Sequence, residues 1–215
     1  MAISRIVGIG GFPDTPLWEH ILELAGGRRV LVDRTATPQF ADSIGLPGDL
    51  TEISFYPWPP ADLREQALAA DAILVGGGNT ANMLAVWRVH GFDRILREAW
   101  EAGVLLTGWS AGMICWFEAG VTDSFGPELD GMRDGLGFLP GSACPHYDGE
   151  ELRRPVYTRL IRDEGFPAGI ALDDGVAAVY EGTELREVVT ARPAAGGYRV
   201  AQDGETPLAV RRLTW

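Results

Sequence analysis

A serine between two glycines is the residue of this chain best suited to covalent chemistry. In the segment GWSAG, Ser110 stands in the pattern G-x-S-x-G, after the apolar run 104–107 and before the apolar stretch 113–117. A serine at such a strand-to-helix turn is strained, and its hydroxyl stands at a helix N-terminus that favours negative charge. The pattern indicates a nucleophile elbow; the alternative is a serine that only caps the following helix.

A serine nucleophile needs a general base, and the chain has three histidines. His20 and His90 stand in stretches of helical period, which is typical of surface or packing residues. His146 follows GSACP and precedes YDGEE, where a strand should end and a helix begin. Because chemistry in α/β proteins gathers at strand ends, His146 is predicted to be the base. The alternative is a loop histidine in solvent.

Two regions could supply the acid that orients the imidazole and stabilises the imidazolium. Asp173 and Asp174, in IALDDGVAA, end an apolar run and precede a glycine. Asp123, in GVTDSFG, follows the elbow more closely along the chain. The residues alone leave both regions open.

An oxyanion hole needs two donors aimed at one point. The backbone N–H of Ala111, directly after the serine, is one candidate. The segment VGGGNT, residues 75–80, could supply the other, because glycines let the backbone approach a ligand closely. A phosphate-binding or dinucleotide loop is the rival interpretation of that segment. It is disfavoured because the segment lacks both G-x-G-x-x-G and a lysine.

These residues stand at the ends of short apolar runs that alternate with amphipathic stretches, which predicts an α/β fold. Residues 5–11, 28–35, 72–78 and 103–110 are predicted to be buried parallel strands, with helices between them. A further helix over 155–165 is followed by strands that we expect to be antiparallel. Residues 117–145 lack regular patterning and are predicted to be a long functional loop. With no linker in view, we predict a single domain over 1–215.

Composition narrows the function further. The net charge of −12 argues against nucleic acid as a partner, because phosphate contacts need a basic face. All 18 basic residues are arginine, which excludes a Ser-Lys dyad and Schiff-base chemistry. No apolar run is long enough to span a bilayer, and two cysteines make neither a disulfide framework nor paired zinc ligands. We therefore expect a cytoplasmic protein with no membrane partner, metal or organic cofactor.

Four ordered segments resemble the peptidase E (aspartyl dipeptidase) family of serine peptidases, to which cyanophycinases are related. They are ILVGGGNTANML, LLTGWSAGMICW, CPHYDGE and IALDDGVAA, between residues 70 and 182. The resemblance implies a three-layer α/β sandwich with a mostly parallel sheet, like class I glutamine amidotransferases, and an antiparallel C-terminal portion. It also implies hydrolysis through an acyl-enzyme.

Carried onto this chain, the family pattern makes Ser110 the nucleophile and His146 the base. Gly78 and Ala111 form the oxyanion hole. The matching acid is Asp174, followed by Asp123 and then Asp173 as alternatives.

The same resemblance implies a short peptide substrate, including one with N-terminal aspartate, and a homodimer. Asn79, Arg153 and Arg154 are the candidate substrate-binding residues, since arginine can bind a carboxylate through two hydrogen bonds. The alternative for the two arginines is ordinary surface charge. Trp109 and its neighbours Trp116 and Phe117 either line a pocket or belong to the core.

Two other functions fit these residues. An esterase or acyltransferase could use the same triad, and a non-catalytic ligand-binding module could keep the fold and the elbow.

Overall fold

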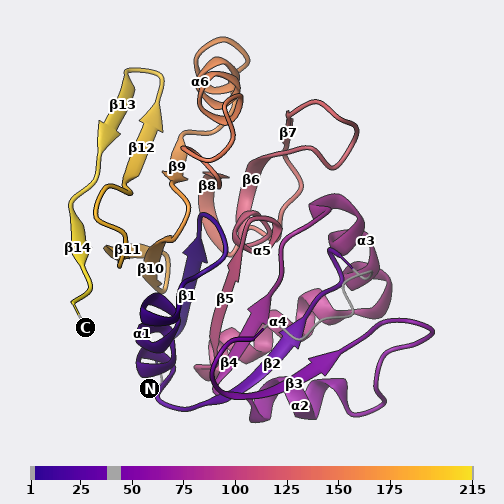
Figure 1. The fold of residues 1–215 in the computed structure, drawn as a ribbon. Helices are drawn as coiled ribbons and strands as arrows, with labels where there is room; N and C mark the ends of the chain where they lie inside the picture. Colours follow the sequence, from indigo (N-terminus) through magenta and orange to yellow (C-terminus); the bar gives the residue numbers. More distant parts are fainter. Residues whose placement is uncertain (1–2, 38–44, 215) are drawn as a thin grey trace.

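The computed structural model describes residues 3–37 and 45–214, and within them two β-sheets are covered by helices (Figure 1). The larger sheet has eight strands in the order β14-β11-β10-β1-β5-β4-β2-β3. Along the chain these strands are β1 (Arg5–Ile9), β2 (Arg29–Asp33), β3 (Asp49–Ile53), β4 (Ala72–Val75), β5 (Leu105–Trp109), β10 (Val176–Glu181), β11 (Glu184–Thr190) and β14 (Val210–Arg212).

The centre of the larger sheet is parallel, as predicted. β1 pairs with β5, β5 with β4, β4 with β2, and β2 with β3, all in the parallel sense. The carboxyl ends of β1, β5, β4 and β2 therefore lie along one edge, where α/β proteins bind ligands. β3 has no counterpart among the predicted strands, because only its last residue is buried.

The C-terminal portion is mainly antiparallel, in agreement with the prediction. β10 runs antiparallel to both β1 and β11, and it joins the C-terminal strands to the parallel centre. β14 differs from the expectation, because it pairs with β11 in the parallel sense.

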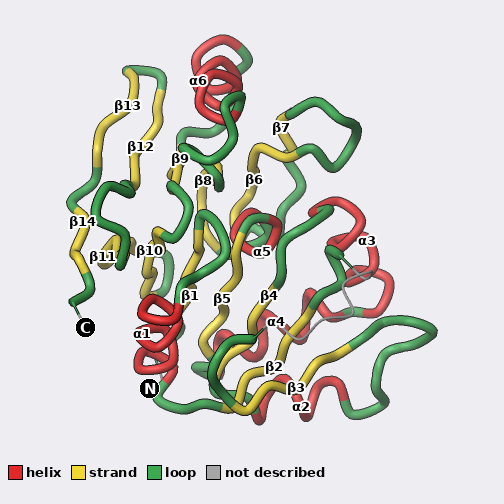
Figure 2. Tube along the Cα trace, viewed as in Figure 1, coloured by secondary structure: helices red, strands yellow, loops and turns green. Residues whose placement is uncertain are grey.

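Helices cover both faces of the larger sheet, which gives the predicted three-layer arrangement (Figure 2). They are α1 (Thr15–Ala25), α2 (Leu63–Ala69), α3 (Thr80–His90), α4 (Phe92–Ala102) and α5 (Ala111–Ile114). On one face α1 packs its Trp18 and Ile21 against Val7, Val32 and Leu74. The other four helices pack on the opposite face.

The stretch of helical period between the third and fourth predicted strands forms two helices, α3 and α4. Gly91, with φ of 72°, ends α3 and is also the N-cap of α4. Glycine adopts this left-handed conformation without the strain that a Cβ brings, so the chain can turn there.

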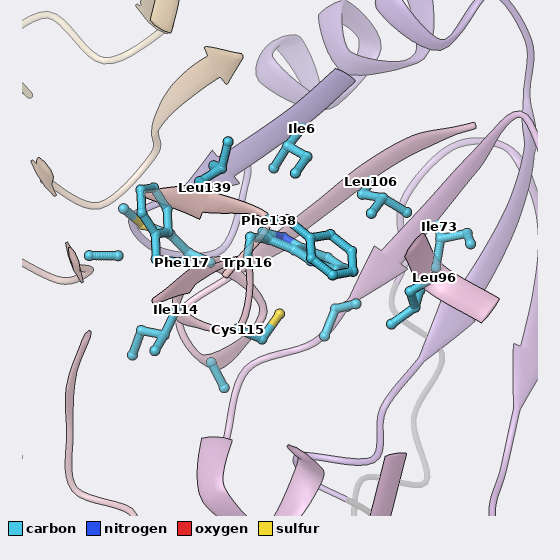
Figure 3. Packing of buried hydrophobic residues seen from close by; sticks show 14 of the residues in the cluster. Ile6, Ile73, Leu96, Leu106, Ile114, Cys115, Trp116, Phe117, Phe138 and Leu139 are labelled. Atoms are coloured by element: carbon cyan, nitrogen blue, oxygen red, sulfur yellow. The ribbon is translucent and has the colours of Figure 1, made fainter. Parts of the chain in front are cut away.

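The main core lies between α2–α5 and the larger sheet, and Figure 3 shows its centre. Trp116 and Phe117 are buried there, with Trp116 stacked on Trp87 at 6.3 Å between ring centroids. These two aromatic residues are therefore core. Trp109 is only half-buried.

Residues 117–145 were predicted to be a long loop, and that prediction is wrong. They contain β6 (Phe117–Thr122), β7 (Asp130–Met132) and β8 (Leu139–Cys144). These strands join a second, six-stranded sheet in the order β13-β12-β9-β8-β6-β7. Its other members are β9 (Gly169–Leu172), β12 (Gly197–Ala201) and β13 (Gly204–Pro207), and α6 (Arg153–Asp163) packs on it. The pattern did not predict β6, β7 and β8, because glycine and proline interrupt this stretch and β7 has only three residues. The segments that form β9, β12 and β13 were predicted to be strands.

Candidate active site

Ser110 occupies a strained turn between β5 and α5. Its φ and ψ are 56° and −114°, a conformation that non-glycine residues rarely adopt. The backbone N–H of Ser110 donates to the Ile9 carbonyl at 3.2 Å, and the Ser110 carbonyl accepts from Ile114 at 3.0 Å. The following glycine is required by close packing, because a Cβ on Gly112 would lie 2.2 Å from the Val75 carbonyl oxygen. The turn therefore has a strained residue between a strand and a helix, as the G-x-S-x-G pattern predicts.

His146 lies at the same strand end as Ser110. Its backbone N–H donates to the Gly10 carbonyl at 3.0 Å, one residue after the carbonyl that holds Ser110. In the described ranges, Ser110 and His146 are the only non-glycine residues with positive φ, and φ of His146 is 54°. Backbone strain of this kind clusters at functional sites, so its occurrence at these two residues marks the end of β1 as a candidate active site.

Asp174 contacts the imidazole directly. His146 Nδ1 and Asp174 Oδ1 lie 2.6 Å apart. The Asp174 backbone N–H donates to Asp148 Oδ1 at 2.8 Å, and this bond fixes the turn that carries the acid. A carboxylate on Nδ1 selects the tautomer in which Nδ1 carries the proton and Nε2 is the acceptor. That tautomer is the one a general base needs.

The other two candidate acids have different surroundings. Asp173 is buried and accepts the Gly196 backbone N–H at 2.7 Å through Oδ2, and burial raises the pKa of its carboxyl. Asp123 is exposed at the end of β6. Among the described residues, neither of these side chains is bonded to His146.

The glycine run after β4 lies beside the serine. A Cβ on Gly77 would stand 3.2 Å from Ser110 Cβ. Thr37 Oγ1 donates to the Gly77 carbonyl at 2.6 Å, and Asn79 N–H donates to the Ala36 carbonyl at 2.9 Å. Gly78, between these two anchors, has φ of 132°, and a Cβ there would lie 2.3 Å from the Ala36 carbonyl oxygen. The residues 33–37 therefore hold this loop in place.

Backbone donors are available on both sides of the serine. Among hydrogen bonds of the described residues, no protein acceptor is found for the N–H of Gly78 or of Ala111. Ala111 begins α5, and Gly78 precedes α3. Free N–H groups at such positions can stabilise an oxyanion.

Sequence analysis missed Asp33, a buried carboxyl at the end of β2. Its Oδ1 accepts from Thr35 Oγ1 at 2.5 Å and its Oδ2 from Trp87 Nε1 at 3.1 Å. Its backbone carbonyl accepts the Gly76 N–H at 2.9 Å. Burial raises the pKa of the Asp33 carboxyl to about 7. Asp33 thus joins β2, α3 and the glycine loop.

A comparison with protein families bears directly on this site. The family model described as peptidase family S51 matches residues 36–188, which include Ser110, His146 and Asp174. The chain belongs to peptidase family S51. Membership makes it a peptidase, and hence a hydrolase.

Individual relatives agree with the S51 assignment. The chain is 47% identical over 167 residues to the uncharacterized peptidase YgaJ of Bacillus subtilis. The aligned region covers 76% of this chain and 72% of YgaJ. The chain is 30% identical over 136 residues to peptidase E of Shewanella denitrificans, covering 59% of this chain and 57% of the relative. The fold resembles the crystal structure of a peptidase from an acI-B1 actinobacterium, with a TM-score of 0.70 and 16% sequence identity. The superposition covers 97% of this chain and 95% of the other.

The candidate substrate-binding residues of this S51 peptidase all have partners within the protein. Arg153 is buried, where its guanidinium donates to Glu150 at 2.7 Å and to the Val121 carbonyl at 2.6 Å. Arg154 pairs with Glu205, and its guanidinium also lies over the rings of two tyrosines, Tyr147 and Tyr198.

Asn79 caps α3 through the Asn82 N–H, and its Nδ2 donates to the Ser124 carbonyl at 2.9 Å. The loop after β6 is thereby tied to the glycine loop beside Ser110.

The other two histidines have surface roles in this S51 peptidase. His20 lies within 3.6 Å of Glu23 and 3.5 Å of Glu187. His90 is exposed and packs against Phe55.

Within the described ranges, no three or more His, Cys, Asp or Glu side chains are grouped so as to hold a metal ion. The same residues include no helix long and apolar enough to cross a membrane.

Proposed function

We propose that this S51 peptidase is a serine peptidase that hydrolyses short peptides through an acyl-enzyme on Ser110. The observation that carries the proposal is the 2.6 Å contact between His146 Nδ1 and Asp174 Oδ1, at a histidine held by the carbonyl next to the one that holds Ser110. A nucleophile, a base and an orienting acid are thereby gathered at one strand end.

In the first half of the reaction, His146 Nε2 takes the proton from Ser110 Oγ as that oxygen attacks the peptide carbonyl carbon. The negative charge that develops on the carbonyl oxygen is stabilised by the N–H groups of Gly78 and Ala111. Asp174 stabilises the imidazolium. The C–N bond then breaks, and His146 gives its proton to the departing amine.

In the second half, a water molecule attacks the acyl-enzyme while His146 accepts one of its protons. The ester bond to Ser110 breaks, His146 returns its proton to Ser110 Oγ, and the acyl group leaves as a carboxylic acid. Two features support these steps: the Asp174 carboxylate lies 2.6 Å from the imidazole, and Ser110 stands in a strained turn directly before α5.

Reaction with a fluorophosphonate probe, followed by peptide mass spectrometry, tests the nucleophile. We expect a single adduct on Ser110, no adduct in Ser110→Ala, and none after heat denaturation. Turnover of a dipeptide library should disappear in the same variant. An intact protein that forms no adduct and cleaves no peptide would overturn the proposal. Hydrolysis of p-nitrophenyl esters without any peptide cleavage would replace it with an esterase.

A further inference from the structure

We infer that Phe12 and Trp109 form an aromatic subsite that selects a large apolar or aromatic side chain on the acyl side of the cleaved bond. This inference rests on the proposed function and specifies its substrate class. The two rings meet edge to face, with 5.0 Å between centroids and an interplanar angle of 77°. Phe12 is 46% exposed, and Trp109 is half-buried.

The position of Trp109 places this subsite beside the nucleophile. Trp109 directly precedes Ser110, and its indole lies against the glycine loop. A Cβ on Gly77 would stand 2.8 Å from Trp109 Nε1 and 3.2 Å from Ser110 Cβ. A Cβ on Gly76 would stand 3.7 Å from the far edge of the same ring. The indole therefore lies along Gly76 and Gly77, beside the serine.

The segment that carries Phe12 runs past the other catalytic candidates. Its Gly10 carbonyl accepts the His146 N–H. At Gly11 the chain is so close to the acid that a Cβ would lie 2.2 Å from Asp174 Oδ1. Phe12 comes next and reaches Trp109. The aromatic pair is thus built from the segment after β1, which holds the histidine, and from the last residue of β5, which precedes the serine.

When the carbonyl oxygen of the scissile bond accepts hydrogen bonds from Gly78 and Ala111, the substrate residue that contributes this carbonyl lies next to the glycine loop. The side chain of that residue is then the part of the substrate nearest to Trp109. An exposed aromatic surface favours apolar groups, because contact removes apolar area from water, and aromatic rings gain further by edge-to-face packing.

The arginines that could bind an acidic side chain of a substrate already have partners within the protein. Arg153 is buried and bonded to Glu150 and a backbone carbonyl, and Arg154 is paired with Glu205. Arg192 lies against Gly175 and is 3.8 Å from Asp14.

On the other side, His146 is flanked by acids: Asp174 bonds the imidazole, Asp148 bonds the backbone of Asp174, and Asp173 precedes it. Like charges would repel an aspartyl substrate here.

Amino-acid p-nitroanilides test the inference, because they vary the acyl residue while the leaving group stays constant. For the wild type we expect kcat/KM to fall in the order Phe, Leu, Ala, Asp. The preference for Phe over Asp should be at least about 10-fold, as expected for an apolar contact. Phe12→Ala should lower the Phe-to-Ala ratio of kcat/KM by about 10-fold, and Phe12→Leu should restore part of it.

The Phe-to-Ala ratio of kcat/KM is the decisive measurement, because a variant that only disturbs the fold lowers kcat/KM for both substrates by the same factor. Trp58→Ala is the matched control. Trp58 is an exposed aromatic residue after β3, which is separated from β5 by β4 and β2, and its loss should leave the ratio unchanged.

A preference for Asp-p-nitroanilide, an unchanged ratio in Phe12→Ala, or a preference that instead follows the leaving-group residue in dipeptides would each overturn the inference. Labelling of Ser110 would leave the proposed function standing in those cases. Absence of both labelling and turnover would remove the two together.

Discussion

Ser110 and His146, 36 residues apart along the chain, are hydrogen-bonded through their backbone N–H groups to successive carbonyls of one strand end. Ser110 donates to Ile9 at 3.2 Å and His146 donates to Gly10 at 3.0 Å. Both residues have positive φ. Strain at a residue persists only where its surroundings hold it, and here one strand end holds both.

This arrangement makes the end of β1 a structural part of the site. Gly10 binds the histidine, Gly11 packs on Asp174, and the same segment then reaches Trp109 through Phe12. Pattern analysis assigned these glycines only to a strand terminus. Their close contacts become visible once the strands are paired.

Replacing the acid is the sharpest test of the triad. Asp174→Asn should lower kcat by roughly 10⁴-fold, because the amide NH₂ favours the tautomer with the proton on Nε2. KM should change little. Steady-state kinetics on a dipeptide measures both constants.

Asp123→Asn is the control for a carboxylate that is exposed and not bonded to His146. It should retain kcat within a few-fold. The reverse pattern, with Asp123→Asn inactive and Asp174→Asn active, would reassign the acid.

A methyl group at Gly11 should disturb the same acid without removing it. The Cβ of Gly11→Ala would lie 2.2 Å from Asp174 Oδ1, so the carboxylate must move away from its contact with His146. We expect kcat to fall by about 10²-fold or more, since misplacement of a catalytic group by about 1 Å has that effect. Gly126→Ala provides the control, because a Cβ there meets nothing within 4 Å. Equal activity of Gly11→Ala and Gly126→Ala would contradict this packing role.

Local patterns predicted the features that depend on neighbours in sequence. Apolar runs ending in glycine identified β1, β4 and β5, and the G-x-S-x-G pattern identified the turn at Ser110. Both depend on short-range sterics and burial, which leave a periodic signal. The strands β6, β7 and β8 of the second sheet left no such signal. β7 has three residues, and β8 contains Pro140 and Gly141.

Side chains whose partners are far along the chain could not be predicted in this way. Arg153 stands at a helix start, where arginine is ordinarily exposed, yet it is buried by contact with Val121, 32 residues earlier. Asp33 looks like a strand-end acid, and its hydrogen-bond partner Trp87 lies 54 residues later in the chain. Only the packing of separate elements determines these surroundings.

The two arginines should respond differently to substitution. Arg153→Met would leave the buried Val121 carbonyl without its donor, and we expect the free energy of unfolding to fall by about 2 kcal/mol. Arg154→Ala removes a partly exposed ion pair with Glu205 and should lower the free energy of unfolding by about 1 kcal/mol or less. Urea unfolding followed by tryptophan fluorescence measures both. If Arg153→Met were as stable as the wild type, the guanidinium would have no structural role.

Asp33 should make stability depend on pH in an unusual direction. Burial raises the pKa of its carboxyl to about 7, above the unfolded value, so the native state holds a proton that the unfolded chain has lost between about pH 4 and pH 7. The stability contribution of this group is therefore fully present below the unfolded pKa and declines as pH rises to about 7. Asp33→Asn keeps an oxygen that accepts from Trp87 Nε1, but its NH₂ group replaces the oxygen that accepts from Thr35 Oγ1, so that the hydroxyl must accept instead. The amide does not titrate. The stability of Asp33→Asn relative to the wild type should then rise by roughly 2–3 kcal/mol from pH 5 to pH 8. Urea unfolding of both proteins at the two pH values gives this difference, and a difference that stays constant would show that the carboxyl is ionised throughout.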